Sequence, residues 1–197
     1  MDNASQPEPR RNRKAARPLD KASLRDLALS YVARFATSSG KLRAYCRRKL
    51  RERGHVGAEE GAPPPDVDAL VADFVTKGYV DDAGFAQTKA DGLLRRGYGA
   101  RRIGAALHAD GIDADLRESV APGEADRREA AVAYARRRRF GPFSRDPGAW
   151  DEGQRQKQLA AMLRAGHSHG LAAHALDAEN GQALEAWIAE AQEDNQC

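Results

Sequence analysis

The chain has 197 residues, only 6% of them aromatic, and a formal net charge of +3. That length allows one compact domain or a short array with a buried core. No apolar run reaches the roughly 20 residues that cross a bilayer, and no apolar signal segment opens the sequence, so we expect a cytoplasmic protein without a membrane partner. Cys46 lies on an apolar stripe and Cys197 at the last position, so no disulfide is expected.

Residues 1–20 are rich in proline and arginine and hold too little apolar surface to order themselves, which predicts a disordered basic tail. A first helical repeat is expected over residues 21–80. In its middle helix, Leu42, Cys46 and Leu50 form one stripe that ends at Gly54. The three helices of this repeat are predicted near residues 23–35, 41–53 and 66–78.

A second repeat is expected over residues 81–121, where Asp81 and Asp82 are predicted to cap its first helix. Gly97 is expected to end that helix and Gly99 to begin the next. A third repeat is expected over residues 122–180. It contains four consecutive arginines, Arg136 to Arg139, and is followed by a C-terminal helix and acidic tail over residues 181–197.

The glycines that close the middle helices, Gly54, Gly111 and Gly166, lie 57 and 55 residues apart. Such a period is typical of stacked helical units. No segment alternates apolar and polar residues with β-branched enrichment, so no strand is predicted. The predicted fold class is all-α, with three tandem three-helix repeats in an elongated array.

Several patterns resemble chemical sites without meeting their requirements. The Ser38-Ser39-Gly40-Lys41 segment lacks the first glycine and the magnesium-binding hydroxyl of a phosphate loop. His167, His169 and His174 do not share one helix face, and no thiol or carboxylate completes a zinc shell. Asp81 and Asp82 are better explained as helix caps than as paired acids, and no nucleophile has a plausible base. We therefore expect no enzyme activity, catalytic residue, cofactor or metal.

The basic residues indicate a function more strongly than these patterns do, because two groups of them flank equivalent turns. Such a track attracts either phosphates or an acidic protein groove, and the sequence leaves both open. Tyr98, beside two glycines, is interpreted as a core plug rather than a contact residue. The predicted partner-binding residues are Arg43, Arg47, Arg48 and Arg51 in the first repeat and Arg95, Arg96, Arg101 and Arg102 in the second.

One family shares the order and spacing of these motifs. They are Gly78-Tyr79-Val80-Asp81-Asp82, Phe85-Ala86, Arg96-Gly97-Tyr98-Gly99, Arg102-Ile103, Leu107 and Gly111-Ile112, with Ser39, Leu42, Arg43, Leu50 and Gly54 in the first repeat. Over about residues 24–180 the chain resembles the RecX regulators of the RecA recombinase. It departs from that family at His167, where an aromatic or aliphatic residue is more usual, and in the long loop at residues 57–65.

The resemblance implies a curved array of three three-helix repeats that has no catalytic activity. It also implies binding in the helical groove of RecA filaments on single-stranded DNA, with modulation, expected to be inhibitory, of recombinase, ATPase and coprotease activity. A role in DNA repair and the SOS response and a monomeric state follow from the same likeness. Contact with single-stranded or double-stranded DNA stays open. The alternative function is a direct DNA-binding protein, because three-helix units resemble helix-turn-helix modules.

Overall fold

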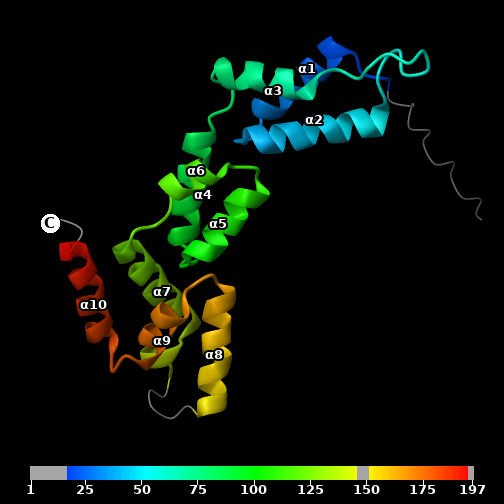
Figure 1. Cartoon of the computed structure of the whole chain (residues 1–197). Coiled ribbons are helices and arrows are strands. Elements are labelled where there is room, and N and C mark those ends of the chain that lie inside the picture. Colours follow the sequence, from blue (N-terminus) through cyan, green and yellow to red (C-terminus); the bar gives the residue numbers. More distant parts are fainter. Residues whose placement is uncertain (1–16, 146–150, 195–197) are drawn as a thin grey trace, which may run out of the picture.

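The computed structural model describes residues 17–145 and 151–194 and shows an elongated chain of helix groups (Figure 1). These described residues form ten α-helices and one short 3-10 helix. They contain no strand, and a single isolated bridge joins Leu19 to His55. The predicted all-α fold class, with three-helix repeats in tandem, is confirmed.

The first repeat packs three helices around a core that includes Phe74 and Leu42, both fully buried. Ser38 and Asp66 begin two of the helices, because each side chain accepts a hydrogen bond from a backbone N–H of the first turn. Gly54 ends the middle helix at a φ of 71°, a value that glycine adopts without strain. The helices are α1 (Lys21–Val32), α2 (Ser39–Arg53) and α3 (Val67–Thr76).

The second repeat has the fewest helical residues of the three and has a separate core. Ile103 and Leu107 of its middle helix are each 1% exposed and pack with Ala86, Ala90 and Ile112. The four-residue step from Ile103 to Leu107 puts both side chains on one face, as the sequence pattern predicts. The helices are α4 (Asp82–Leu94), α5 (Ala100–Ala109) and α6 (Ala114–Ser119).

The third repeat builds its core around Met162 and Leu176. Its first helix ends at Arg139, whose φ of 57° makes it a left-handed stop without glycine. A further helix packs against that first helix and lies at the side of the third repeat (Figure 1). The elements are α7 (Glu124–Arg138), the 3-10 helix η1 (Gly141–Phe143), α8 (Glu152–Arg164), α9 (His169–Asp177) and α10 (Gly181–Asp194).

The predicted disordered tail ends earlier than expected. Leu19 is fully buried in the first core. Its backbone N–H donates to the Gly54 carbonyl at 3.0 Å, and its carbonyl accepts from Val56. The prediction is therefore wrong for Leu19 and for Asp20, which caps α1. A single leucine in a proline-rich segment gives no periodic signal, which is why the pattern missed it. Residues 1–16 of the predicted tail and the last three residues of the acidic tail lie outside the described residues.

Adjacent repeats meet through pairs of glycines. Gly40, in the first turn of α2, lies against Gly111, which follows α5, and a Cβ on Gly40 would sit 2.6 Å from the Gly111 Cα. Gly99, which begins α5, lies in the same way against Gly166, which follows α8. In both junctions the start of one middle helix contacts the glycine that closes the next. The periodic glycines therefore do more than end helices, because two of them join the repeats.

Candidate partner-binding surface

The Arg-Arg-Gly-Tyr-Gly segment forms the tight turn between α4 and α5. Gly97 has a φ of 73°, and its N–H donates to Leu94 at 2.6 Å while the Tyr98 N–H donates to Leu93 at 3.1 Å. Gly99 then begins α5 without a side-chain cap. Its N–H donates instead to Ala165 of the third repeat at 3.0 Å. The predicted helix stop and helix start are confirmed, and the turn is also the joint to the third repeat.

The joint between the first two repeats depends on side chains. The Asp82 carboxylate accepts from the Ser39 N–H at 2.8 Å and from its hydroxyl at 2.6 Å. The Asp110 carboxylate contacts Lys89 of its own repeat and also lies 3.7 Å from Lys41 of the first repeat. Asp81 caps α4 as predicted, but the prediction of a second cap at Asp82 is wrong, because that carboxylate binds across the junction.

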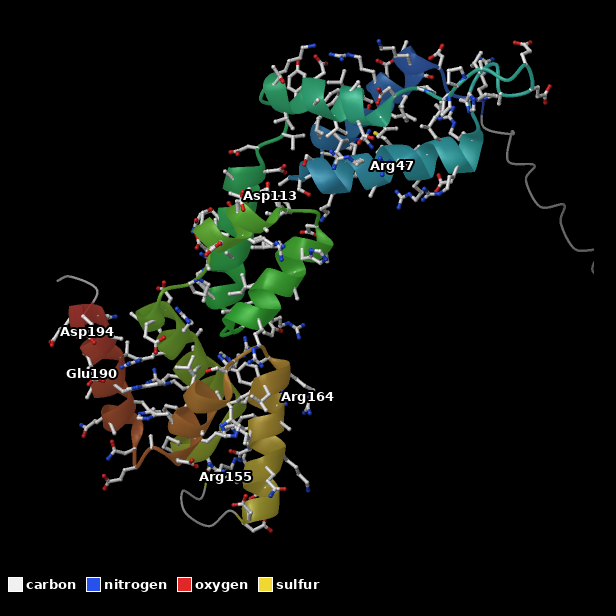
Figure 2. The ribbon with its side chains drawn as sticks, viewed as in Figure 1. Arg47, Asp113, Arg155, Arg164, Glu190 and Asp194 are labelled. Carbon is white, nitrogen blue, oxygen red and sulfur yellow. The ribbon has the colours of Figure 1, made fainter. Side chains whose placement is uncertain are left out.

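Arginines of α2 are largely paired with acids. Arg43 and Arg47 both contact the carboxylate of Asp68 on α3, at 2.7 and 2.9 Å. The hydrogen bond from Arg43 is the main reason that the pKa of Asp68 lies below its usual range. Arg48 lies 3.5 Å from Glu52, and Arg51 is exposed. This predicted group lies together on one helix (Figure 2 labels Arg47), but acids offset much of its charge.

The second predicted group gathers around the α4–α5 turn. Arg95, Arg96, Arg101 and Arg102 are exposed. None of them forms an ion pair with a carboxylate in the part of the chain that the structure describes. The Arg102 guanidinium lies 4.4 Å from the centre of the Tyr98 ring, and Arg96 lies 5.8 Å from it. Tyr98 is half-buried against the second core, so the predicted plug also offers a ring surface to arginines.

Three further arginines lie beside this second group and were not predicted. Arg137 and Arg138 of α7 and Arg164 of α8 line one hollow of about 440 Å³ together with Arg102. The run of arginines at residues 136–139 was the only sequence signal for them. Arg164 gave none, because its approach to Arg102 depends on how two repeats pack. Figure 2 shows Arg164 at the end of α8 that lies nearest α5.

The three histidines of the third repeat have different environments. His167 is buried at the junction, where its Nε2 lies 3.0 Å from the Gly97 carbonyl oxygen. Burial lowers the pKa of His167, against a smaller opposing effect of that hydrogen bond. His174 stacks on Trp187 of α10, with ring centres 4.1 Å apart, and His169 is exposed.

Among the described residues, no group of three or more histidine, cysteine or acidic side chains is placed to hold a metal ion. Burial raises the pKa of the Cys46 thiol to about 11, so the thiol stays protonated and unreactive at neutral pH. Within the same part of the chain, no helix is both long and apolar enough to cross a membrane.

Three-helix repeats joined by glycine contacts define a helical-repeat protein. Residues 81–120 match the family model described as "RecX, second three-helix domain". A regulatory protein RecX from Myxococcus xanthus is 35% identical over 171 residues, which cover 85% of this chain and 91% of that protein. One from Mycobacterium avium is 31% identical, over 80% and 87% of the two chains.

Solved structures share the fold. The crystal structure of RecX from Lactobacillus salivarius superposes with a TM-score of 0.55 and covers 87% of this chain and 96% of that one, at 15% identity. A second crystal structure of a regulatory protein RecX has a TM-score of 0.53. The chain belongs to the RecX family of regulatory proteins.

Proposed function

We propose that this chain regulates a RecA-type recombinase by binding in the groove of its filament on single-stranded DNA. The expected effect is inhibition of recombinase, ATPase and coprotease activity without chemistry of its own. The observation that carries this proposal is the similarity to the Myxococcus xanthus protein, which extends over 91% of that regulatory protein.

The arrangement of the repeats supports the proposal. Each repeat has a separate core, and an elongated array can contact several protomers of a helical filament in turn. The glycine contacts at both joints bring the backbones of neighbouring repeats close together. A protein of this form fits a long groove better than a single small site.

We propose the predicted arginines as the contact residues, in two groups of different strength. Arg43, Arg47, Arg48 and Arg51 form the α2 group, and Arg95, Arg96, Arg101 and Arg102 form the turn group. The turn group is free of carboxylate partners among the described residues, so it would lose fewer existing interactions on binding an acidic or phosphate-bearing surface. We expect this group to contribute more to affinity.

We also propose functional units at residues 21–80, 81–121 and 122–180, followed by the C-terminal segment at 181–197. In this proposal the chain acts as a monomer in the cytoplasm, in DNA repair and the SOS response. Its regulatory effect requires no cofactor. A sedimentation measurement on the isolated protein tests the monomeric state directly.

The decisive measurement is the single-stranded-DNA-dependent ATPase rate of the recombinase from the same organism, with this protein at substoichiometric amounts. We expect the rate to fall, because one regulator in a filament groove affects more than one protomer. An increase in rate would reverse the proposed direction, and the absence of both an effect and filament binding would exclude the function.

The contact residues are tested with the variant Arg101→Glu/Arg102→Glu. Reversing two charges should weaken filament binding on the order of tenfold or more. The matched control is Arg34→Glu/Arg117→Glu, which makes the same change in charge outside both groups. Helicity should stay the same in both variants, as measured by circular dichroism. Equal binding by the two variants would show that Arg101 and Arg102 are not part of the interface.

A further inference from the structure

A cationic hollow lies at the joint between the second and third repeats. It measures about 440 Å³ and is formed by the α4–α5 turn, α5, α7 and α8. Its lining contains no carboxylate. The side chains that define it, here called the arginine hollow, are Tyr98, Arg102, Tyr134, Arg137, Arg138 and Arg164.

The four guanidiniums of this hollow lack compensating charge. None forms a salt bridge within residues 17–145 and 151–194, although neighbouring arginines do. Arg136, in the same helix turn as two of them, lies 3.2 Å from Glu185, and Arg128 lies 3.0 Å from Glu190. Like charges gathered in one hollow repel each other, so a bound anion relieves an unfavourable interaction there.

The walls between these charges are aromatic. Arg102 and Arg137 lie 4.4 and 5.9 Å from the Tyr98 ring centre. Arg137 also lies 5.6 Å from the centre of the Tyr134 ring. All four cations are arginines, whose planar guanidinium binds phosphate through two hydrogen bonds and stacks on flat rings. A hollow of this kind offers both charge and stacking surfaces.

We propose that the arginine hollow binds single-stranded nucleic acid directly, with phosphodiesters on the guanidiniums and a base against the tyrosine and guanidinium planes. An acidic peptide would satisfy the charges but has no rings to use the stacking surfaces. Single strands supply both, since bases free of a duplex stack on aromatic and arginine side chains. This inference does not depend on the proposed binding to a recombinase filament.

The hollow also spans two repeats, because Tyr98 and Arg102 come from the second repeat and the other four residues from the third. A strand bound there contacts both sides of the joint. Ligands that bind only the folded arrangement stabilise it according to their concentration and affinity. We therefore expect an oligonucleotide to raise the melting temperature of the protein, and to raise it less when the arginines are removed.

The test uses the full chain, without recombinase, and fluorescence anisotropy of labelled dT20 at several salt concentrations. For the variant Arg102→Gln/Arg164→Gln we expect binding about tenfold weaker near ~0.1 M salt. The slope of log K against log salt should also fall by about 1.4, at roughly 0.7 per lost phosphate contact. The variant Arg137→Gln/Arg138→Gln should behave in the same way. All four side chains are exposed, so both variants should keep wild-type circular dichroism.

The matched control is Arg34→Gln/Arg117→Gln, which removes two positive charges that do not line the hollow and should leave affinity and salt slope near those of the wild type. An equal loss in this control would overturn the proposal, because binding would then follow net charge alone. Unchanged binding in both hollow variants would also overturn it. Poly-glutamate of matched charge should compete poorly, and competition equal to that of unlabelled dT20 would exclude nucleic acid as the preferred ligand.

Discussion

The two joints of the molecule share one backbone contact but differ in what surrounds it. Gly40 meets Gly111 at the first joint, and Gly99 meets Gly166 at the second. Around the first, Asp82 binds Ser39 and Asp110 lies near Lys41 of the neighbouring repeat. The second relies on backbone hydrogen bonds and a buried histidine. The arginines that gather beside it have no carboxylate partner within residues 17–145 and 151–194.

This difference indicates that the glycine contact sets the geometry, while side chains set how strongly each joint is held and what it offers outward. At the first joint the acidic side chains bind groups of the protein itself. At the second, the Arg101 N–H donates to Gly166 at 3.2 Å through its backbone, which leaves its guanidinium exposed. The second joint is therefore better suited to an external anionic partner.

The largest effect is expected from adding a methyl group to a joint glycine. In Gly166→Ala, a residue with a φ of 98° gains a Cβ that would lie 2.5 Å from the Arg102 nitrogen. Left-handed strain and overpacking against backbone together should cost about 3 kcal/mol of unfolding free energy. Urea denaturation followed by circular dichroism measures this cost.

The control for that change is Gly54→Ala, since Gly54 has a φ of 71° but no atom within 4 Å of an added Cβ. It carries the backbone strain alone and should cost about 1 kcal/mol. Similar losses of unfolding free energy in the two variants would mean that the close backbone approach at the joint does not add to the cost.

A smaller effect is expected at the side chains of the first joint. Asp82→Asn removes the charge that binds Ser39 and one of its two acceptors, and should cost about 1.5 kcal/mol. The neighbouring Asp81→Asn is the matched control, because asparagine caps a helix as well as aspartate does. The denaturation midpoints of the two variants test this prediction. A larger loss of stability in Asp81→Asn than in Asp82→Asn would contradict it.

The smallest effect is a pH dependence at the second joint. The pKa of His167 is lowered in the folded state by burial, and its Nδ1 has no hydrogen-bond partner among the residues that the structure describes. The unfolded chain therefore binds this proton more readily, and stability should fall as the pH drops through the unfolded value of about 6.5. The slope from this group cannot exceed about 1.4 kcal/mol per pH unit.

The measurement compares the unfolding free energies at pH 7.5 and pH 5.5 for the wild type and for His167→Gln. Glutamine keeps a donor for the Gly97 carbonyl but does not titrate. The drop between the two conditions should be smaller in the variant. An identical drop in both proteins would show that His167 contributes nothing to the pH dependence.

Much of the fold could be predicted from the sequence, because its determinants are local. Ser38 and Asp66 mark helix starts, and Gly54 and Gly111 mark helix ends, within one turn of the residues they affect. The spacing of Ile103 and Leu107 likewise identifies the buried face from the chain alone. Such signals need no knowledge of the packing between repeats.

The joints and the candidate surface could not be predicted in the same way, because they depend on residues far apart in the chain. Gly40 and Gly111 contact each other although α3, α4 and α5 lie between them in the sequence, and Arg43 meets Asp68 across a loop. Helix periodicity carries no information about such pairs. The predicted arginines therefore include several that acids already hold, and they omit Arg164, which packing brings to the hollow.

Gly54, which closes the middle helix of the first repeat, lies at one end of the array of repeats. In the third repeat the Gly166 carbonyl receives a backbone N–H from the preceding repeat. No repeat precedes the first one within the described residues, and there the corresponding carbonyl of Gly54 receives the N–H of Leu19. The terminal units of a repeat array differ from the inner ones because they have a neighbour on one side only. A second copy that docked on Gly54 as the second repeat docks on Gly166 would first have to displace Leu19 from its buried position.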